Sequence, residues 1–277
     1  MIKLGEYNVL KAIRRTDNGF YLADTEGVEV LLPNAYVSEE LKEEDEIGVF
    51  VYKDSEDRPV ATTLYPKIML GEFACLKVIN VNNIGAFMDW GLPKDLLCPF
   101  AEQRTEMLEG RSYIVYLLLD EKSDRLIATA KVNAHFETEN IELEVGQEVD
   151  LLIAGKSDMG YKCVINQKYV GLIFANETFQ KMRLGLETKG YVKNIREDKK
   201  IDISLQQESY KNIEPNSLFI LEFLKENEGF SNITDKTDTI VIKEIFQMSK
   251  KSFKRAIGTL YKQKLIRIEE DGIYLVK

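Results

Sequence analysis

The feature that most constrains the fold is an internal repeat, because self-similarity at a fixed period points to repeated structural units. Three segments open on Gly5, Gly71 and Gly146, and each runs through alternating apolar residues into a second turn centred on glycine. They are "GEYNVLKAIRRTDNGFYL", "GEFACLKVINVNNIGAFM" and "GQEVDLLIAGKSDMGYKCVI". Period-two alternation, β-branched residues and turn residues at intervals of roughly eight to twelve predict about five short strands per repeat.

Five short strands within about 65 residues favour a small closed barrel, because an open sheet of that size would leave its edges unprotected. We therefore expect a multidomain, mainly β protein with three five-stranded barrels of the OB type. The predicted barrels cover residues 1–66, 67–139 and 140–213.

The last 64 residues, 214–277, have a different pattern that predicts an α+β domain. The segment "LFILEFLKENEG" has leucines at helical spacing and ends at Gly229. A second helix is expected to begin near Asp238, and a third at Ser249, which is a suitable N-cap residue. The final segment "LIRIEEDGIYLVK" predicts two strands joined by a tight turn. Three helices and a β-wing indicate a winged helix, which is a variant of the helix-turn-helix.

Each repeat resembles an S1-type RNA-binding domain, the OB barrel that is repeated in a small-subunit ribosomal protein. The S1 pattern includes a G-A-F turn, a G-L-V-H-I-S segment, and D-x-x-x-R before I-x-L-S. In the second repeat "IGAFMDWG" and "KDLLCPF" are similar to the first two elements. In the third repeat "VGLIFANE" and "REDKKIDISL" are similar to the last two. Three such units followed by a winged helix resemble the conserved virulence factor B family of bacterial RNA-binding proteins, which implies a regulatory role.

This resemblance implies RNA-contacting positions in the second and third repeats. In the second repeat, Phe87 stands at an aromatic position of the turn and Arg125 is similar to the arginine of the D-x-x-x-R element. In the third, the corresponding candidates are Tyr161, Lys162, Phe174, Arg196 and Lys200. Aromatic rings stack on unpaired bases and cations follow the phosphates, so these residue types suit a single-stranded ligand. A ring at the start of a barrel strand can instead pack inward, and alternation alone leaves both faces open for Phe87.

The third helix of the last domain presents a run of cations with no acid between residues 249 and 264. The candidates for phosphate contact are Lys250, Lys251, Lys254, Arg255 and Lys262. An ordinary solvated helix face is the alternative interpretation, because lysines are common on surfaces. Side chains suited to base recognition are scarce here, so the helix is not expected to demand a particular sequence.

The charge is distributed unevenly along the chain. The formal net charge of −9 divides into −7, −3, 0 and +1 over the four predicted domains in order. Because phosphate contacts supply most of the non-specific affinity for nucleic acid, we expect binding through the second half of the chain. The first repeat is then a structural or protein-contact module.

Other classes of function find little support in the composition. Cys75, Cys98 and Cys163 form no CxxC pair, and His135 is the single histidine, so neither a disulfide framework nor a zinc site is expected. The three cysteines are expected to be small buried residues on strands, Trp90 a structural residue, and His135 a residue near a joint between domains. There is no P-loop, nucleophile elbow or HExxH motif, so we expect neither an enzyme nor a cofactor. No apolar run suits a membrane span or a secretory signal, which favours a cytoplasmic protein without a membrane partner.

The sequence therefore predicts a non-catalytic RNA-binding protein, acting after transcription through the third barrel and the basic helix. Two alternatives remain open. One is a DNA-binding transcription regulator that uses the winged helix on a duplex. The other is a protein-interaction scaffold, which the isoelectric point near 5.0 would suit. The oligomeric state is left undetermined.

Overall fold

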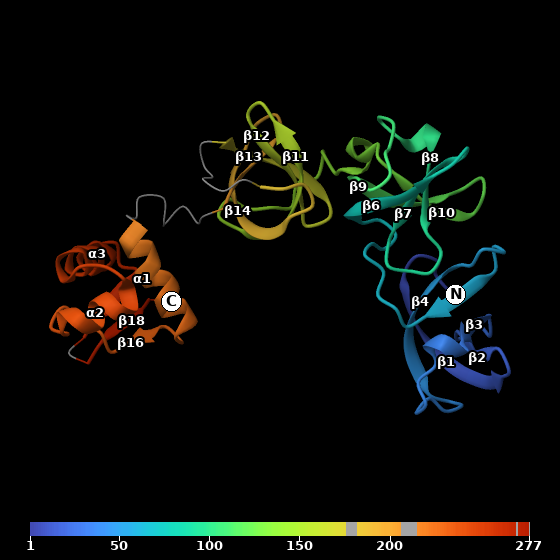
Figure 1. Cartoon of the computed structure of the whole chain (residues 1–277), viewed down its shortest axis with the longest axis horizontal. Helices are drawn as coiled ribbons and strands as arrows, with labels where there is room; N and C mark the ends of the chain where they lie inside the picture. Colours follow the sequence, from blue (N-terminus) through green and yellow to red (C-terminus); the bar gives the residue numbers. More distant parts are fainter. Residues whose placement is uncertain (176–181, 206–214, 270, 277) are drawn as a thin grey trace. The chain divides into compact units, whose positions relative to one another are not determined.

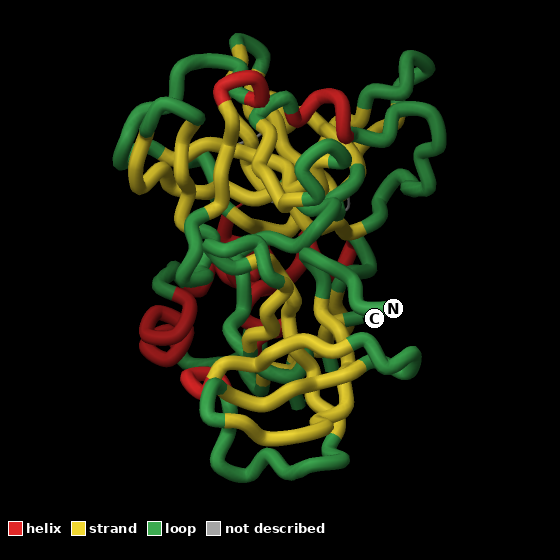
Figure 2. The backbone as a smooth tube through the Cα atoms, turned by 90° about the vertical axis from the view of Figure 1, so that its right-hand side faces the viewer, coloured by secondary structure: helices red, strands yellow, loops and turns green. Residues whose placement is uncertain are grey.

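The structure is a computed structural model that describes residues 1–175, 182–205, 215–269 and 271–276. The chain divides into two compact units, Met1–Leu205 and Gln206–Lys277. Strands build the first unit and helices dominate the second (Figures 1 and 2). The predicted boundary between residues 213 and 214 lies outside the described residues.

The first barrel closes through hydrogen-bonded neighbours in the order β1-β2-β3-β5-β4. Its strands are β1 (Tyr7–Thr16), β2 (Gly19–Ala23), β3 (Glu29–Pro33), β4 (Glu46–Lys53) and β5 (Pro59–Thr62). Alternate residues of β2 turn inward, so Phe20 and Leu22 are buried in the barrel core while Tyr21 lies on the outside. The short helical turn η1 (Asn34–Tyr36) follows β3.

The third barrel repeats this order as β11-β12-β13-β15-β14 and is also closed. Its strands are β11 (Glu148–Ser157), β12 (Gly160–Ile165), β13 (Tyr169–Phe174), β14 (Glu187–Ile195) and β15 (Ile201–Ser204). The parallel seam between β13 and β15 joins three residue pairs, from Gly171↔Ile201 to Ile173↔Ile203. The predicted OB-type topology is thus confirmed in two copies.

The second barrel differs from the expectation at one seam. Its strands are β6 (Phe73–Val81), β7 (Gly85–Asp89), β8 (Leu96–Pro99), β9 (Ser112–Asp120) and β10 (Arg125–Thr129). They form a five-stranded sheet in the order β10-β9-β6-β7-β8, without a described ladder between β8 and β10. The two strands still lie side by side, and Glu102 bridges them from η2 (Phe100–Glu102) by accepting from the Thr129 hydroxyl at 2.6 Å.

A glycine begins the second strand of every barrel and explains the repeat seen in the sequence. Gly19, Gly85 and Gly160 have φ angles of +150°, +156° and +154°. An added Cβ would lie 2.0 to 2.3 Å from a carbonyl oxygen of the third strand in the same barrel. Only glycine permits this close crossing, so the turn fixes both the strand pairing and the position of the next residues.

Apolar contacts join the barrels within the first unit. Trp90, 3% exposed, packs edge-on against Phe50 and Tyr52 of the first barrel, with ring centroids 5.9 and 6.0 Å apart. Phe73 of the second barrel shares a smaller buried cluster with Leu152 and Val164 of the third. The prediction that Trp90 is structural is therefore confirmed.

His135 also lies where it was expected, in η3 (Val132–His135) between the second and third barrels, with its ring stacked 4.1 Å from that of Tyr116.

Of the cysteines, Cys98 and Cys163 are buried on strands, as predicted, while Cys75 is half-buried. Burial raises the thiol pKa of Cys98 and Cys163 to about 12, so both thiols stay protonated at neutral pH.

The second unit is a winged helix, as predicted. Its elements are α1 (Pro215–Glu226), β16 (Phe230–Ser231), α2 (Thr239–Phe246), α3 (Lys250–Lys262), β17 (Ile266–Ile268) and β18 (Ile273–Leu275). Asp238 caps α2 by accepting from the Ile240 amide, and Ser249 caps α3 by accepting from the Ser252 amide at 3.1 Å. The three strands form a sheet in the order β16-β18-β17, in which β16 was not expected. Within the described ranges, no helix is both long and apolar enough to span a membrane.

Candidate nucleic-acid interface

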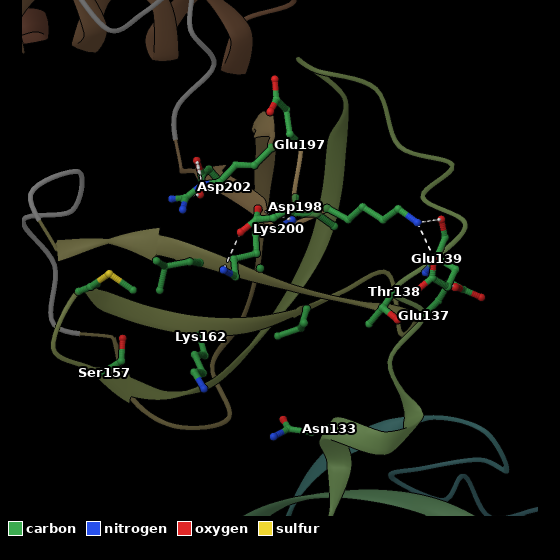
Figure 3. A pocket seen from close by; sticks show the side chains of 17 residues that line it. Asn133, Glu137, Thr138, Glu139, Ser157, Lys162, Glu197, Asp198, Lys200 and Asp202 are labelled. Atoms are coloured by element: carbon green, nitrogen blue, oxygen red, sulfur yellow. Dashed lines mark hydrogen bonds and ion pairs between the residues drawn. The ribbon is translucent and has the colours of Figure 1, made fainter.

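A cleft of about 740 Å³ opens on the outer face of the third barrel (Figure 3). It is lined by β12, β13 and β15, by the β11–β12 and β14–β15 turns, and by residues of segment 133–139, which precedes the barrel. OB folds bind oligonucleotides on the face of their second and third strands, between the first and fourth inter-strand loops. The cleft occupies that place, because β12 and β13 are the second and third strands of this barrel.

Outward-facing residues of β12 and β13 form the floor of the cleft. Lys162 pairs with Leu172 across the two strands, and Val170 lies two residues earlier on the same face. Their inward neighbours Cys163 and Ile173 are fully buried in the barrel core. The side chain of Lys162 is exposed and makes no hydrogen bond or ion pair with any residue that the structure describes. The floor is therefore apolar with one available cation.

Arg196 connects the floor to an aromatic ring. Its Nε donates a hydrogen bond to Oδ2 of Asp202 at 3.0 Å, and its Nη2 forms an ion pair with Oδ1 of the same carboxylate at 2.8 Å. The guanidinium carbon also lies 5.6 Å from the ring centroid of Phe174, and the Lys193 ammonium lies 5.9 Å from the same centroid. The hydrogen bond that Arg196 donates to Asp202 raises the pKa of the guanidinium, which therefore stays charged. Phe174 and Arg196 thus form a fixed cationic and aromatic pair beside the cleft.

The β14–β15 turn carries the remaining cations, both paired with exposed acids. Lys200 contacts Asp198 at 2.6 Å, and this contact lowers the pKa of the Asp198 carboxyl. Lys199 contacts Glu139 at 2.5 Å and so ties the turn to the segment preceding the barrel. Surface pairs of this kind contribute roughly 0 to 1 kcal/mol, so an anionic ligand can replace the carboxylates at little cost.

Tyr161, another predicted contact, lies on the other side of its strand. It packs against the core cluster of the third barrel and does not line the cleft. It holds the first position after Gly160, and the equivalent Phe20 and Ala86 of the other barrels are buried. Because side chains alternate along a strand, it is the second position, Lys162, that faces the ligand side. The structure therefore assigns Tyr161 to packing.

Phe87 and Arg125 occupy the corresponding face of the second barrel, where the space is smaller. Phe87 is partly buried on β7, and both residues line a cavity of about 120 Å³. Tyr52 and Lys53 of the first barrel form part of the wall of this cavity. Arg125 forms an ion pair with Asp57, which also belongs to the first barrel. These two candidates are thus in contact with another part of the chain.

The cations of α3 fall into two groups. Lys251, Arg255 and Lys262 are exposed and lie at helical spacing on the side opposite the buried Phe253, Ala256, Ile257 and Leu260. Lys250 and Lys254 lie to one side, where Lys250 donates to the Thr237 carbonyl at 2.8 Å and Lys254 pairs with Asp235 at 3.2 Å. The side formed by Lys251, Arg255 and Lys262, together with the intervening Gly258, is called the α3 face below.

Sequence reasoning missed several residues of the third-barrel cleft. Asp202 and Glu139 escaped notice because their role depends on partners that are brought close only by the fold. The alternating pattern of β13 placed Val170 and Leu172 on one face of the strand. Which face this is follows from the pairing of β13 with β12, which begins at Gly160. Lys199 could have been found, since it stands in the same turn as Arg196 and Lys200.

The fold and these surfaces define a class of protein in which S1-type barrels precede a winged helix. Residues 4–64 match the S1 domain family, and residues 219–275 match the CvfB-like winged helix domain family. OB barrels and helix-turn-helix domains are both nucleic-acid-binding architectures. The S1 match lies on the acidic first barrel.

Relatives match along nearly the whole chain. YitL of Bacillus subtilis is 29% identical over 98% of this chain and 93% of its own length. Conserved virulence factor B of Staphylococcus epidermidis is 28% identical over 99% of this chain and 95% of its own length. The resemblance to the conserved virulence factor B family that the sequence motifs indicated is thereby confirmed.

A solved structure from Streptococcus pneumoniae, described as a multidomain protein with nucleic acid binding domains, covers 99% of this chain and 98% of its own. It has 24% sequence identity to this chain and a TM-score of 0.42.

Proposed function

We propose that this chain is a non-catalytic RNA-binding protein of the cytoplasm that regulates transcripts after synthesis. It binds single-stranded RNA through the third-barrel cleft and the α3 face. The observation that carries the proposal is the position of the cleft, which opens on the β12–β13 face and the two loops that OB folds use for oligonucleotides.

The composition of the cleft suits unpaired bases. Val170 and Leu172 offer an apolar floor, and the Phe174 ring beside Arg196 offers a place to stack. Bases of single-stranded RNA stack on aromatic rings and on guanidinium planes, and each stacked base contributes about 1 to 3 kcal/mol. Asp202 holds Arg196 in place, so little side-chain entropy remains to be lost when a base arrives.

The phosphates have a separate set of partners. Lys162 is available on the floor, while Lys199 and Lys200 can exchange the exposed carboxylates of Glu139 and Asp198 for phosphate oxygens. An exchange of this kind releases cations from the RNA but leaves the protein with carboxylates beside the ligand. We therefore expect an affinity that depends on salt yet is moderate.

The test is a titration of the full chain with a single-stranded RNA, the matching single-stranded DNA and the duplex DNA, each at several salt concentrations. Lys162→Ala and Arg196→Ala should each weaken RNA binding at least several-fold. Lys189→Ala is the matched control, because Lys189 is an exposed lysine of the same barrel that lies outside the cleft. Equal affinities for all three variants would remove the cleft from the site.

Binding to duplex DNA is the second candidate, and the geometry of the winged helix favours it. In a helix-turn-helix the second helix enters the major groove, and α3 follows α2 with a capped N-terminus and exposed cations. A clear preference for duplex over single strands, lost on substitution of Lys251 and Lys262 by alanine, would support it. If neither RNA nor DNA binds with an affinity that depends on salt, both nucleic-acid functions fail, and the chain is better described as a protein-interaction scaffold.

A further inference from the structure

The second barrel carries the same kind of ligand face as the third. Phe87 is the second residue after Gly85 and pairs with Leu97, as Lys162 is the second residue after Gly160 and pairs with Leu172. Arg125 begins β10 and lines the cavity on this face, at the end of the fourth inter-strand turn. An aromatic ring beside a cation is a suitable combination for single-stranded nucleic acid.

This face is already in contact with an acidic turn of the first barrel. The turn between β4 and β5 is residues 54–58, and its first four residues, Asp54-Ser55-Glu56-Asp57, are called the acidic turn here. Asp57 forms an ion pair with Arg125, and its carboxylate lies 3.8 Å from the Lys94 ammonium. Lys94 also donates to the Asp54 carbonyl at 2.6 Å. Both cations of the second barrel's face are thus engaged by the first barrel.

Further contacts hold the acidic turn in place. Lys53, at the end of β4, donates to the carbonyl and the carboxylate of Asp124 at 2.6 and 2.5 Å. Beside these polar contacts, Trp90 packs against Phe50 and Tyr52, and its indole N–H donates to the Lys94 carbonyl at 2.5 Å. A buried aromatic cluster next to the ion pairs distinguishes this contact from a chance encounter of surface charges.

The electrostatics of the contact match those of a bound polyanion. The hydrogen bond from Arg125 is the largest cause of a lowered pKa for the Asp57 carboxyl, and the charges of Arg125, Lys94 and Lys53 add to it. The carboxylate therefore stays ionised and keeps its negative charge beside Arg125 and Lys94. What remains of the face is the cavity of about 120 Å³, compared with about 740 Å³ on the third barrel.

We propose that the acidic turn is a built-in substitute for a nucleic-acid strand, and that it occupies the ligand face of the second barrel. Nucleic acid then reaches the third barrel but not the second in the intact chain. This inference rests on the proposed function, because it specifies which barrels take part in binding. It also gives the acidic first barrel a definite role.

The first test compares the two faces in the intact protein. Arg125→Ala and Phe87→Ala should change single-stranded RNA affinity by less than about twofold, while Arg196→Ala weakens it several-fold. A loss from Arg125→Ala as large as that from Arg196→Ala would overturn the inference, because it would mean that RNA reaches the second barrel.

The second test releases Arg125 from its ion pair with Asp57. Asp57→Asn keeps the shape of the turn but removes its charge, so Arg125 becomes available to a phosphate. RNA affinity should rise by roughly two- to fivefold, the size of one exposed ion pair, and the salt slope should steepen by about 0.7. Adding Arg125→Ala should abolish the gain. Glu56→Gln is the matched control, because this neighbouring carboxylate pairs with Arg58 of its own barrel at 3.0 Å.

The outcomes separate the inference from the proposed function. If the unmodified chain binds no RNA but Asp57→Asn does so through Arg125, the third-barrel site fails and the substitute role of the acidic turn stands. If Asp57→Asn behaves like Glu56→Gln, the acidic turn is an ordinary domain contact and the inference fails. Thermal unfolding of each variant confirms that the barrels remain folded.

Discussion

Replacing Gly258 by alanine should stabilise the winged helix and weaken nucleic-acid binding at the same time. Gly258 lies within α3, on the face that carries Lys251, Arg255 and Lys262. A Cβ added there would meet nothing within 4 Å, so the chain's own packing does not require glycine. Glycine in a helix interior costs about 1 kcal/mol relative to alanine, and that cost has no internal compensation here.

The size of the effect on stability follows from the length of the domain. A gain of about 1 kcal/mol raises the midpoint of thermal unfolding by roughly 4 to 8 °C in a domain of 60 to 100 residues. Circular dichroism at a helix-sensitive wavelength reports the unfolding of this unit, because all α-helices of the described residues, α1, α2 and α3, belong to it.

Gly258→Ala should weaken nucleic-acid binding, although it stabilises the domain, if the α3 face contacts nucleic acid. Glycine lets another backbone approach closely, and a methyl group between Arg255 and Lys262 would hold a phosphate backbone away from the helix. We expect a several-fold loss of affinity measured by fluorescence anisotropy. A variant that gains stability and keeps its affinity would refute close approach at this face. A variant that gains no stability would refute the argument about packing.

Further substitutions test different parts of the molecule. Trp90→Ala should destabilise the first unit by about 3 to 5 kcal/mol in calorimetry, because the indole is buried between two barrels; a loss below about 1 kcal/mol would contradict that role. Burial lowers the pKa of His135, so the free energy of unfolding should fall as the pH drops below about 6.5, and His135→Phe should reduce this slope; an unchanged slope would count against the histidine. Lys251→Ala and Lys262→Ala should each reduce the salt slope of RNA binding by about 0.7, whereas Phe174→Ala should weaken binding with little change in slope. If the salt slope of RNA binding changed only in Phe174→Ala, the assignment of phosphate contact to the lysines and of base stacking to Phe174 would be wrong.

The fold was largely predictable because its determinants are local. Gly19, Gly85 and Gly160 stand at backbone positions that only glycine fits, and the alternation after each glycine describes one strand. The helix caps of the winged helix were equally visible, since Asp238 and Ser249 act on amides two or three residues away. The open seam of the second barrel was not predictable, because it depends on whether two distant strands pair.

The candidate site was predictable only in part. The cations of the β14–β15 turn could be found, but the side of the strand that faces the ligand could not be chosen from alternation alone. Tyr161 and Lys162 are neighbours, and the register with β13 places the first against the core and the second in the cleft. Arg125 was a reasonable candidate by motif, and its partner Asp57 lies 68 residues earlier in the chain.

The three barrels show why the net charge of a domain is a poor guide to what its ligand face can bind. In the first barrel Tyr21 holds the position equivalent to Phe87, and the Arg14 guanidinium lies 4.2 Å from its ring centroid. Arg14 is paired in turn with Glu29. In the second barrel both cations of the face, Arg125 and Lys94, contact the first barrel. In the third barrel Arg196 is paired with Asp202 of the same barrel, while Lys162 remains available. The difference between these barrels lies in which partner each cation already has, so removing a single carboxylate, Asp57, should change binding more than neutralising any other acid of the first barrel.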